Sequence, residues 1–490
     1  MMSKEHLNGP SFHATTISGL TSGSFLRDND IAEWLPAARP SEDADRKAPL
    51  HQALVRHGQD GALQVAGHHF PIGCVALEIT QRCNLDCTAC YLSDLSEAVK
   101  DLPLPEILRR IDEIAHHYGP RTNVQITGGD PTLRSIDDLE KIVRHISSHN
   151  MRAALFTNGI KATRSMLMRL AKVGLNDVAF HVDITQERKG YASEADLNVI
   201  RDEYIARARG TGLQVLFNTT IYEGNIGDVA MLAKFFRDRA RDVHLASFQM
   251  IADTGRGVDR DRSNAITQDS VIEKISQGAG IDLSFDMPRV GHSDCNRYAG
   301  ILTAGDRTAA IFTPKDRPFL EAVFQAGRNW FSDRHDLRGT ITNTASSLFH
   351  DPGLGLRSID FGLRKLWRLR GGLLASRGRI NRLTFYIHNF MHADHLERER
   401  CESCVFMTMT RDGPISMCVH NAKRDTFLTQ AVKLGDEEWS PLPDGLHRDI
   451  IDIGALPLKR LKGRARAEKM SMRAHQNLQT RDHPIRDKVS

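Results

Sequence analysis

The sequence lacks the apolar segments that secreted and membrane-spanning chains carry. Its beginning, MMSKEHLNGPSFHATT, holds no apolar stretch of the kind a secretory signal needs, and nowhere do about 18 uncharged apolar residues follow one another. We therefore expect a cytoplasmic protein. A strong excess of one charge is also missing, since 65 basic and 61 acidic residues leave a formal charge of +4. Such a small excess gives no reason to expect nucleic-acid binding.

Cysteine is scarce, because the 490 residues hold eight and none precedes Cys74. Seven of the eight form a triplet, a pair and two single positions, which are Cys83, Cys87 and Cys90, then Cys401 and Cys404, then Cys295 and Cys418. Disulfides are the competing explanation for this grouping. A long chain without a visible secretory signal favours a metal or cluster held by these thiols.

The hydrophobic pattern changes near residue 75. Residues 1–70 show little periodicity and predict a loosely structured N-terminal extension, whereas short β-rich runs then alternate with amphipathic helical stretches. Six strands are expected, over 75–80, 123–127, 152–157, 177–183, 213–221 and 243–250. Helices are expected between them, over 104–118, 136–149, 165–173, 194–209 and 229–240.

Six such repeats predict an α/β fold with a parallel sheet, an open (β/α)6 partial TIM barrel rather than a closed eightfold one. We place this core at residues 71–285. In folds of this kind the chemistry lies at the carboxyl ends of the strands, in the loops that lead to the helices. Every candidate motif of the core lies at or just after a predicted strand end.

The first motif is the loop Cys83-Asn-Leu-Asp-Cys87-Thr-Ala-Cys90, which follows the first strand of the core. A [4Fe-4S] cube held by three cysteines has one open iron, which can bind the amino and carboxylate groups of S-adenosylmethionine (SAM) and reduce its sulfonium. A structural zinc site is the alternative, but it needs a fourth Cys or His nearby and none follows within the loop. The spacing therefore favours a catalytic cluster.

This loop, in its place after the first strand of a βα barrel, resembles that of the radical SAM superfamily. The resemblance implies that Cys83, Cys87 and Cys90 are the catalytic cluster ligands. After the second strand, Gly128-Gly129-Asp130-Pro131 is similar to the Gly-Gly-Glu-Pro turn of that superfamily, whose backbone receives the amino group of SAM. Glycine permits the close backbone approach that such a turn needs.

Two more strand ends carry weaker signals. Thr157 and Asn158 begin a Thr-Asn-Gly turn like that of the superfamily, and His181 and Asp183 lie where a polar residue commonly faces the SAM ribose. A hydrogen-bonded pair at the barrel end explains His181 and Asp183 equally well.

The chain departs from the superfamily at two of these positions. Asp130 stands where Glu is usual, so the contacts of its side chain stay open. Ala89 stands before the third cysteine, where the superfamily usually has an aromatic residue. Packing against the adenine of SAM would then come from Tyr91 or from the backbone alone.

A second set of cysteines lies beyond the barrel. Cys401-x2-Cys404 is followed by Cys418, and Cys295 lies far upstream. Four thiolates can close one site, which we predict to be a second [4Fe-4S] cluster without an open iron. A zinc site with four cysteine ligands stays open as the alternative, because spacing does not separate the two.

The segment 387–425 carries a more specific resemblance. With its Asp-Gly-x4-Cys-x2-Asn ending, from Asp412 to Asn421, it is similar to the superfamily branch of archaeal tetraether lipid synthases and pterin-methylase-like proteins. The resemblance implies an auxiliary-cluster and substrate region over 286–425. The C-terminal tail that follows, 426–490, is expected from its composition to be partly disordered. The cysteine-rich N-terminal segment of the archaeal members has no counterpart, so extra metal centres are not expected.

Residues 361–382 hold seven Lys or Arg and no acid, interleaved with apolar residues. This composition predicts a helix on an anionic membrane surface, although a solvated helix at the barrel edge explains it equally well. The residues expected to face lipid are Arg364, Lys365, Arg368 and Arg370, with Leu363, Leu366 and Trp367 in the headgroup boundary. A second basic run, 458–473, lacks aromatic residues and is expected to be disordered.

Together these features predict reductive cleavage of SAM to a 5′-deoxyadenosyl radical, which functionalises an unactivated carbon by carbon-carbon bond formation or methylation. The lipid-synthase resemblance and the basic stretch favour a lipid chain as the organic substrate and contact with the inner membrane surface. Flavodoxin or ferredoxin would donate the electron. A maturase of a peptide or pterin is the alternative within the superfamily, and a non-catalytic iron-sulfur or zinc scaffold is the alternative outside it.

Overall fold

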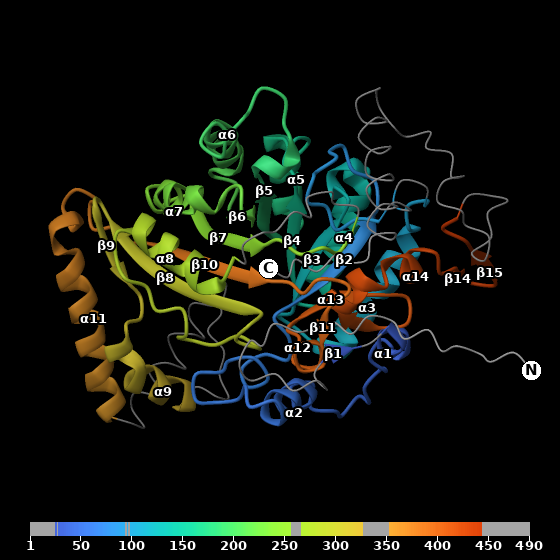
Figure 1. Ribbon diagram of the computed structural model, residues 1–490, viewed down its shortest axis with the longest axis horizontal. Coiled ribbons are helices and arrows are strands. Elements are labelled where there is room, and N and C mark those ends of the chain that lie inside the picture. Colours follow the sequence, from blue (N-terminus) through green and yellow to red (C-terminus); the bar gives the residue numbers. More distant parts are fainter. Residues whose placement is uncertain are drawn as a thin grey trace, which may run out of the picture.

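The computed structural model describes residues 25–442 apart from 27, 94–95, 97–98, 256–265 and 327–351. The basic run 458–473 lies outside these residues. An eleven-stranded sheet runs through the molecule and helices pack along it (Figure 1). Its strand order is β13-β12-β2-β3-β4-β5-β6-β7-β10-β8-β9.

The centre of this sheet consists of the six strands predicted from the sequence. They are β2 (Cys74–Thr80), β3 (Asn123–Gly128), β4 (Arg152–Thr157), β5 (Leu175–His181), β6 (Gln214–Ile221) and β7 (Val243–Met250), each parallel to the next. The connecting helices are α3 (Leu104–Tyr118), α4 (Ile136–Ser148), α5 (Arg164–Lys172), α6 (Asn198–Ala208) and α7 (Val229–Arg237). The predicted open (β/α)6 core is therefore confirmed.

Alternation along the strands decides which side chains reach the candidate site. Leu77 and Ile79 of β2 belong to the same buried core as Ile107 and Ile111 of α3, so they face the helices. Because successive strand residues point to opposite faces, Glu78 faces the concave side of the sheet. Polar residues inside an apolar strand are thereby directed toward the region where the motifs meet.

The sheet is longer than the six predicted strands, because the C-terminal part of the chain adds strands at both edges. β10 (Asn381–Asn389) pairs in parallel with β7, and β12 (Phe406–Met409) pairs in parallel with β2. Antiparallel strands continue outward, namely β8 (Asn296–Ala304) and β9 (Arg307–Ala310) beyond β10, and β13 (Pro414–Ser416) beyond β12. Sequence patterns missed these strands, since a four-residue strand such as β12 carries almost no periodicity.

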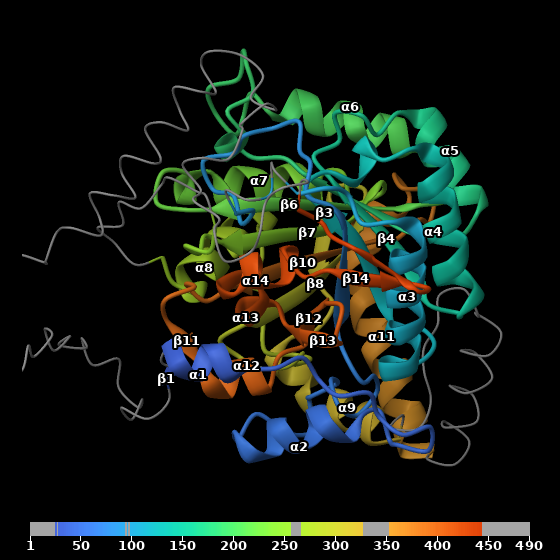
Figure 2. The same ribbon diagram turned by 90° about the vertical axis from the view of Figure 1, so that its right-hand side faces the viewer.

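The remaining elements surround this sheet. They are β1 (Phe25–Leu26), α1 (Asp28–Glu33), α2 (Ala48–Arg56), α8 (Gln268–Ala279), α9 (Arg317–Ala326), α11 (Pro352–Leu373), β11 (Leu396–Glu397), α12 (Arg398–Glu402), α13 (Met417–Ala422), α14 (Arg424–Leu428), β14 (Val432–Leu434) and β15 (Glu437–Trp439). Leu50 and Leu54 of α2 pack against Val405, so part of the predicted N-terminal extension is ordered on the C-terminal region (Figure 2). Among the residues described, no helix combines the length and the apolar character needed to span a bilayer.

Candidate active site

The three-cysteine loop follows β2 and is held by the ends of two other strands. Cys83, Cys87 and Cys90 are half-buried. The Thr88 N–H donates a hydrogen bond of 2.8 Å to the Thr185 carbonyl, beyond β5. Asn158, just beyond β4, donates from Nδ2 to Asn84 Oδ1 at 2.6 Å, and the same nitrogen lies 4.0 Å from Cys83 Sγ. Motifs that are far apart in the sequence therefore converge on this loop.

The Gly-Gly turn after β3 packs directly on the beginning of the cysteine loop. The Gly129 N–H donates to the Thr80 carbonyl and the Asp130 N–H to the Arg82 carbonyl, both at 2.8 Å. A Cβ atom on Gly129 would lie 2.0 Å from the Arg82 carbonyl oxygen, and Gly128 has a φ of +128°. Only glycine allows this approach, so the turn and the loop form one continuous backbone surface.

Asp130, which replaces the usual Glu, points into the protein. Its buried carboxylate accepts hydrogen bonds at 2.9 Å from the Thr132 N–H, the Thr157 hydroxyl and the Asn158 N–H. Pro131 begins the short 3-10 turn that follows. The Asp130 side chain thus joins the ends of β3 and β4, and the backbone of the turn is the part that faces the cysteine loop.

His181 and Asp183 form a hydrogen-bonded pair at the end of β5. His181 Nε2 lies 2.6 Å from Asp183 Oδ2, which also accepts from the Thr220 N–H at 2.8 Å. Burial alone would raise the pKa of Asp183, but the neighbouring His181 and the hydrogen bonds from Thr185 and Thr220 hold that pKa well below its usual value. The His181 side chain is 34% exposed whereas Asp183 is fully buried. His181 is therefore the member of the pair that a ligand can reach.

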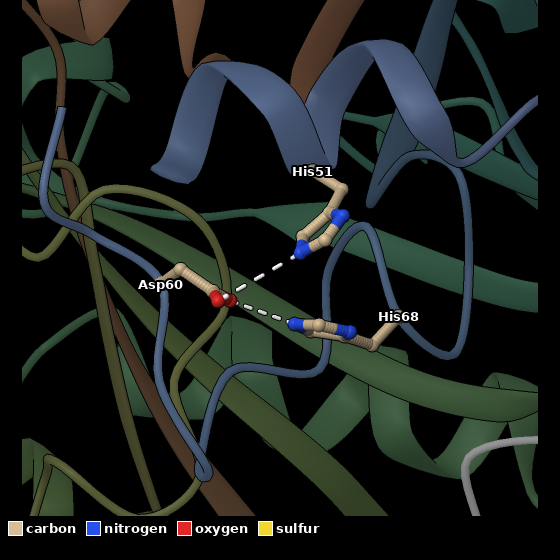
Figure 3. A group of neighbouring side chains, drawn as sticks. All are labelled: His51, Asp60 and His68. Atoms are coloured by element: carbon tan, nitrogen blue, oxygen red, sulfur yellow. Dashed lines mark hydrogen bonds and ion pairs between the residues drawn. The ribbon is translucent and has the colours of Figure 1, made fainter. Parts of the chain in front are cut away.

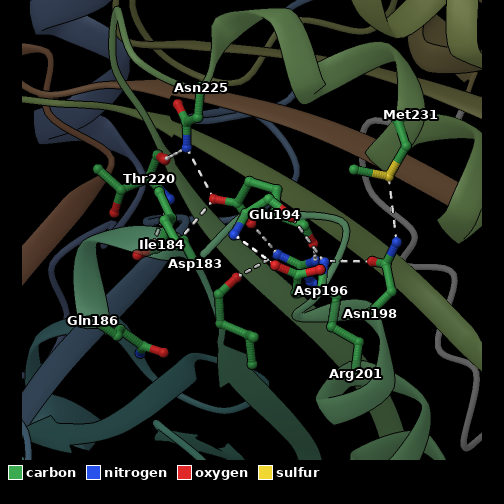
Figure 4. A network of polar contacts seen from close by, with 12 residues as sticks. Asp183, Ile184, Gln186, Glu194, Asp196, Asn198, Arg201, Thr220, Asn225 and Met231 are labelled. Atoms are coloured by element: carbon green, nitrogen blue, oxygen red, sulfur yellow. Dashed lines mark hydrogen bonds and ion pairs between the residues drawn. The ribbon is translucent and has the colours of Figure 1, made fainter. Parts of the chain in front are cut away.

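A fully buried ion pair, which the sequence did not reveal, supports this strand end (Figure 4). The side chains of Glu194 and Arg201 are both 0% exposed and pair with each other. Arg201 also donates to the Val182 carbonyl at 2.9 Å, and Glu194 accepts from the Ile184 N–H at 3.0 Å. The pair thereby fixes the backbone on both sides of Asp183. In the sequence both residues belong to a predicted amphipathic helix, where charges usually face solvent.

A second buried ion pair lies beside Tyr91. The Tyr91 hydroxyl donates to the Gly128 carbonyl, and the Arg424 guanidinium lies 4.7 Å from the centre of its ring. Arg424 also donates to both oxygens of Glu78 at 2.9 Å. Burial alone would raise the pKa of Glu78, but Arg424 lowers it. The only visible signal for this pair was a glutamate inside the apolar strand sequence VALEIT.

The second set of cysteines gathers in the C-terminal region. Burial raises the pKa of Cys295 to about 11 and that of Cys418 to about 12, and Cys404 reinforces both shifts as a neighbour. Burial also raises the pKa of Cys401, and the other three cysteines raise that pKa further. Cys74, which the sequence left unassigned, is buried beside Cys404. These mutual influences indicate that Cys295, Cys401, Cys404 and Cys418 lie in one region of the C-terminal part, although no three of their sulfur atoms lie within 4.8 Å of one another.

Arg400 is a cation within this group. It is 6% exposed, and its Nε donates to Cys295 Sγ at 3.2 Å. Its other nitrogens donate to the Asn389 carbonyl at 2.7 Å and to Glu397 at 2.9 Å, which fixes the guanidinium. A buried positive charge beside a thiol favours the thiolate, the form that binds metals and clusters.

Comparison with known proteins agrees with the motifs. Residues 77–235 match the family model of the radical SAM superfamily. The chain is 27% identical over 186 residues to the 7,8-dihydro-6-hydroxymethylpterin dimethyltransferase of Methanocaldococcus jannaschii, covering 37% of this chain and 36% of that protein. It is 26% identical to the Fe-coproporphyrin III synthase of Methanosarcina barkeri, over 49% of this chain and 58% of that protein. It is 28% identical to the GTP 3′,8-cyclase of Aquifex aeolicus, over 55% of this chain and 86% of that protein.

Proposed function

Because residues 77–235 make this chain a member of the radical SAM superfamily, we propose that it cleaves SAM reductively and functionalises an unactivated carbon of an organic substrate. The observation that carries the proposal is the convergence of the three-cysteine loop, the Gly-Gly turn and Asn158 at the carboxyl ends of the central strands. The superfamily implies a [4Fe-4S] cluster and SAM, which when bound supply the electron and the alkyl radical.

The residues at these strand ends fit the [4Fe-4S] cluster and SAM. Cys83, Cys87 and Cys90 would hold the cluster, with the Asn158 amide as a donor toward the sulfur of Cys83. The backbone of Gly128 and Gly129, which packs directly on the beginning of the cysteine loop, would accept the amino group of SAM. His181 would face the ribose, and Tyr91, which is 37% exposed as a residue, would contact the adenine. Because the side chains of Asp183, Glu194 and Arg201 are fully buried, water is kept away from the charges at the end of β5.

The experiment that tests this function is anaerobic reconstitution of the chain with iron and sulfide, followed by incubation with SAM and a strong reductant. Formation of 5′-deoxyadenosine, measured by chromatography, is the expected result. A non-catalytic iron-sulfur or zinc scaffold would form none, whatever its metal content.

We further propose that Cys295, Cys401, Cys404 and Cys418 hold a second [4Fe-4S] cluster. The burial of Cys401 and Cys418, the half-buried Cys295 and Cys404 nearby, and the Arg400 guanidinium beside Cys295 support a site for several thiolates. A neighbouring cation stabilises the more negative, reduced state of a cluster, which would raise its reduction potential. A four-cysteine zinc site is the alternative, and iron and zinc contents separate the two.

The Cys401→Ala variant is expected to lose about half of the reconstituted iron, because two [4Fe-4S] clusters have separate ligand sets. Iron and zinc per chain, measured by mass spectrometry, are the readout. Cys74→Ala is the matched control, since it removes a buried cysteine beside the group and should keep the full iron content. Unchanged iron in Cys401→Ala, or one zinc per parent chain bound through sulfur, contradicts the second cluster.

For the substrate we propose a lipid chain, presented while α11 lies on an anionic membrane surface. Part of the expected lipid-facing set is wrong, because Lys365 is buried and its Nζ donates to Asp316 at 2.8 Å. Arg364 binds the other oxygen of Asp316 at 2.7 Å. A buried ammonium needs such a partner, and composition does not show which lysine has one.

The opposite face of α11 supports the proposal more strongly than the basic residues do. Large apolar side chains recur there every three or four residues, so they form one stripe along the helix. Helix α11 itself lies at the outer end of the molecule (Figure 1). The apolar side chains of the stripe are Leu356, Ile359, Leu363, Leu366 and Trp367, with exposures of 71%, 61%, 60%, 44% and 66%. Arg357, Arg368 and Arg370 are exposed beside this stripe. Because one of the relatives is a pterin dimethyltransferase, a pterin is the alternative substrate.

Changing Arg357, Arg368 and Arg370 to Gln is expected to release the chain from anionic vesicles, because each contributes on the order of 1 kcal/mol of attraction. Cosedimentation at increasing anionic lipid content and salt is the measurement. The matched control changes three exposed basic residues of α4 and α5, Lys141, Arg144 and Lys172, to Gln. A parent chain that stays in the supernatant at low salt with vesicles in excess contradicts the membrane proposal.

A further inference from the structure

We propose that His51, Asp60 and His68 bind a divalent transition-metal cation, a site that the radical SAM function does not use. Figure 3 shows both imidazoles directed at the carboxylate. His68 Nε2 lies 2.7 Å from Asp60 Oδ1, and His51 Nε2 lies 3.7 Å from Asp60 Oδ2. One possible ligand atom from each residue lies within 4.8 Å of the other two. Two histidines and one carboxylate form a ligand set that zinc and related divalent cations accept.

The fold brings these three residues together from separate segments. His51 lies on α2, Asp60 lies in the turn after that helix, and His68 lies in the turn before β2. Gly67 makes the approach possible, since it has a φ of +75° and a Cβ there would lie 2.9 Å from the His51 Cα. Lys47 Nζ donates to the His68 carbonyl at 3.1 Å and holds the turn against α2. The ligand positions are therefore set by backbone packing.

The group is also accessible to a cation from solvent. The side chains of His51, Asp60 and His68 are 40%, 30% and 13% exposed. A cation can therefore enter from solvent, and water can complete its coordination.

A second group with the same composition provides a comparison. Asp112 on α3 faces His145 and His149, at 2.6 and 2.8 Å. There both imidazoles approach the same oxygen, Oδ1, and the carboxylate is 53% exposed. In the first group each imidazole approaches a different carboxylate oxygen, and the carboxylate is more buried, at 30% exposed. We therefore assign the cation to the first group and use the second as its control.

The probe is Zn²⁺ added to the full chain after its iron-sulfur clusters have been reconstituted. After dialysis against a weak chelator, the parent is expected to retain one zinc more than the double variant His51→Asn and His68→Asn. X-ray absorption at the zinc edge should show nitrogen and oxygen ligands at about 2.0–2.1 Å and no sulfur at about 2.3 Å. The Asp60→Asn variant keeps the side-chain shape and should weaken zinc binding by more than the roughly 100-fold typical of changes behind the ligands. The control His145→Asn and His149→Asn should retain the zinc.

Iron content reports whether each variant keeps its fold. If the double variant loses iron, the zinc content of Asp60→Asn decides whether the three residues bind the cation. Three results would overturn the assignment. They are equal zinc in the parent and Asp60→Asn, zinc bound only through sulfur, and loss of the zinc in the control variant. Hydrogen bonds alone would then explain the contacts of Asp60.

Discussion

Replacing Cys83, Cys87 and Cys90 together by alanine is expected to abolish formation of 5′-deoxyadenosine from SAM, and each single replacement should reduce it to background. Two thiolates cannot hold a cluster that keeps one open iron, because each cysteine binds a different iron of the cube. The assay is anaerobic incubation with SAM and reductant, with 5′-deoxyadenosine quantified against the reconstituted parent chain.

The Cys74→Ala variant is the control for this experiment. It removes a cysteine that lies in β2 itself, a few residues before the loop, and it should keep the parent rate. Iron content adds a second readout, since the triple variant should retain only the iron of the proposed second cluster. Parent-level 5′-deoxyadenosine from the triple variant would end the proposed function, whatever the fate of the second cysteine group.

Local sequence patterns were sufficient for the six central strands and for the position of the cysteine loop. Runs such as Val75 to Thr80 combine β-branched and apolar residues over the length of a single strand, and the loop cysteines follow directly. Such signals are contained within a few residues. They are strongest where a parallel strand is buried on both faces, as β2 is along its whole length.

The contacts that complete the site had no such local signal. Glu78 and Arg424 pair across 346 positions of the sequence, and Arg424 also covers Tyr91. Lys365 was assigned to the wrong side of α11 because composition gives a charge but not its partner, Asp316. Long-range ion pairs of this kind are decided by tertiary packing.

The Glu78 and Arg424 pair also links the two cysteine sites. Arg424 begins α14, directly after the helix that carries Cys418. Its guanidinium lies over the ring of Tyr91, which follows the last cysteine of the three-cysteine loop. Strand β12, which follows Cys404, pairs with β2, which precedes Cys83. The C-terminal region is therefore part of the same sheet as the proposed SAM site.

Replacing Arg201 by methionine is expected to destabilise the chain by roughly 3–5 kcal/mol, because the change leaves the fully buried Glu194 carboxylate without its cationic partner. The double variant Arg201→Met and Glu194→Gln removes both charges and should recover much of that loss. Denaturant unfolding of the parent, the two single variants and the double variant gives the coupling free energy between the residues.

Lys234→Met is the matched control, because the exposed Lys234 of α7 pairs with the exposed Asp238 just beyond the helix and should contribute less than about 1 kcal/mol. The effect of Arg201→Met should also reach the active site. Arg201 binds the Val182 carbonyl and Glu194 binds the Ile184 N–H, so the backbone that orients His181 and Asp183 loses its support. Formation of 5′-deoxyadenosine should then fall under conditions where the variant is still folded. An Arg201→Met chain with parental stability would mean that solvent reaches Glu194, and the support assigned to this pair would have to come from Asn225 and Thr220 alone.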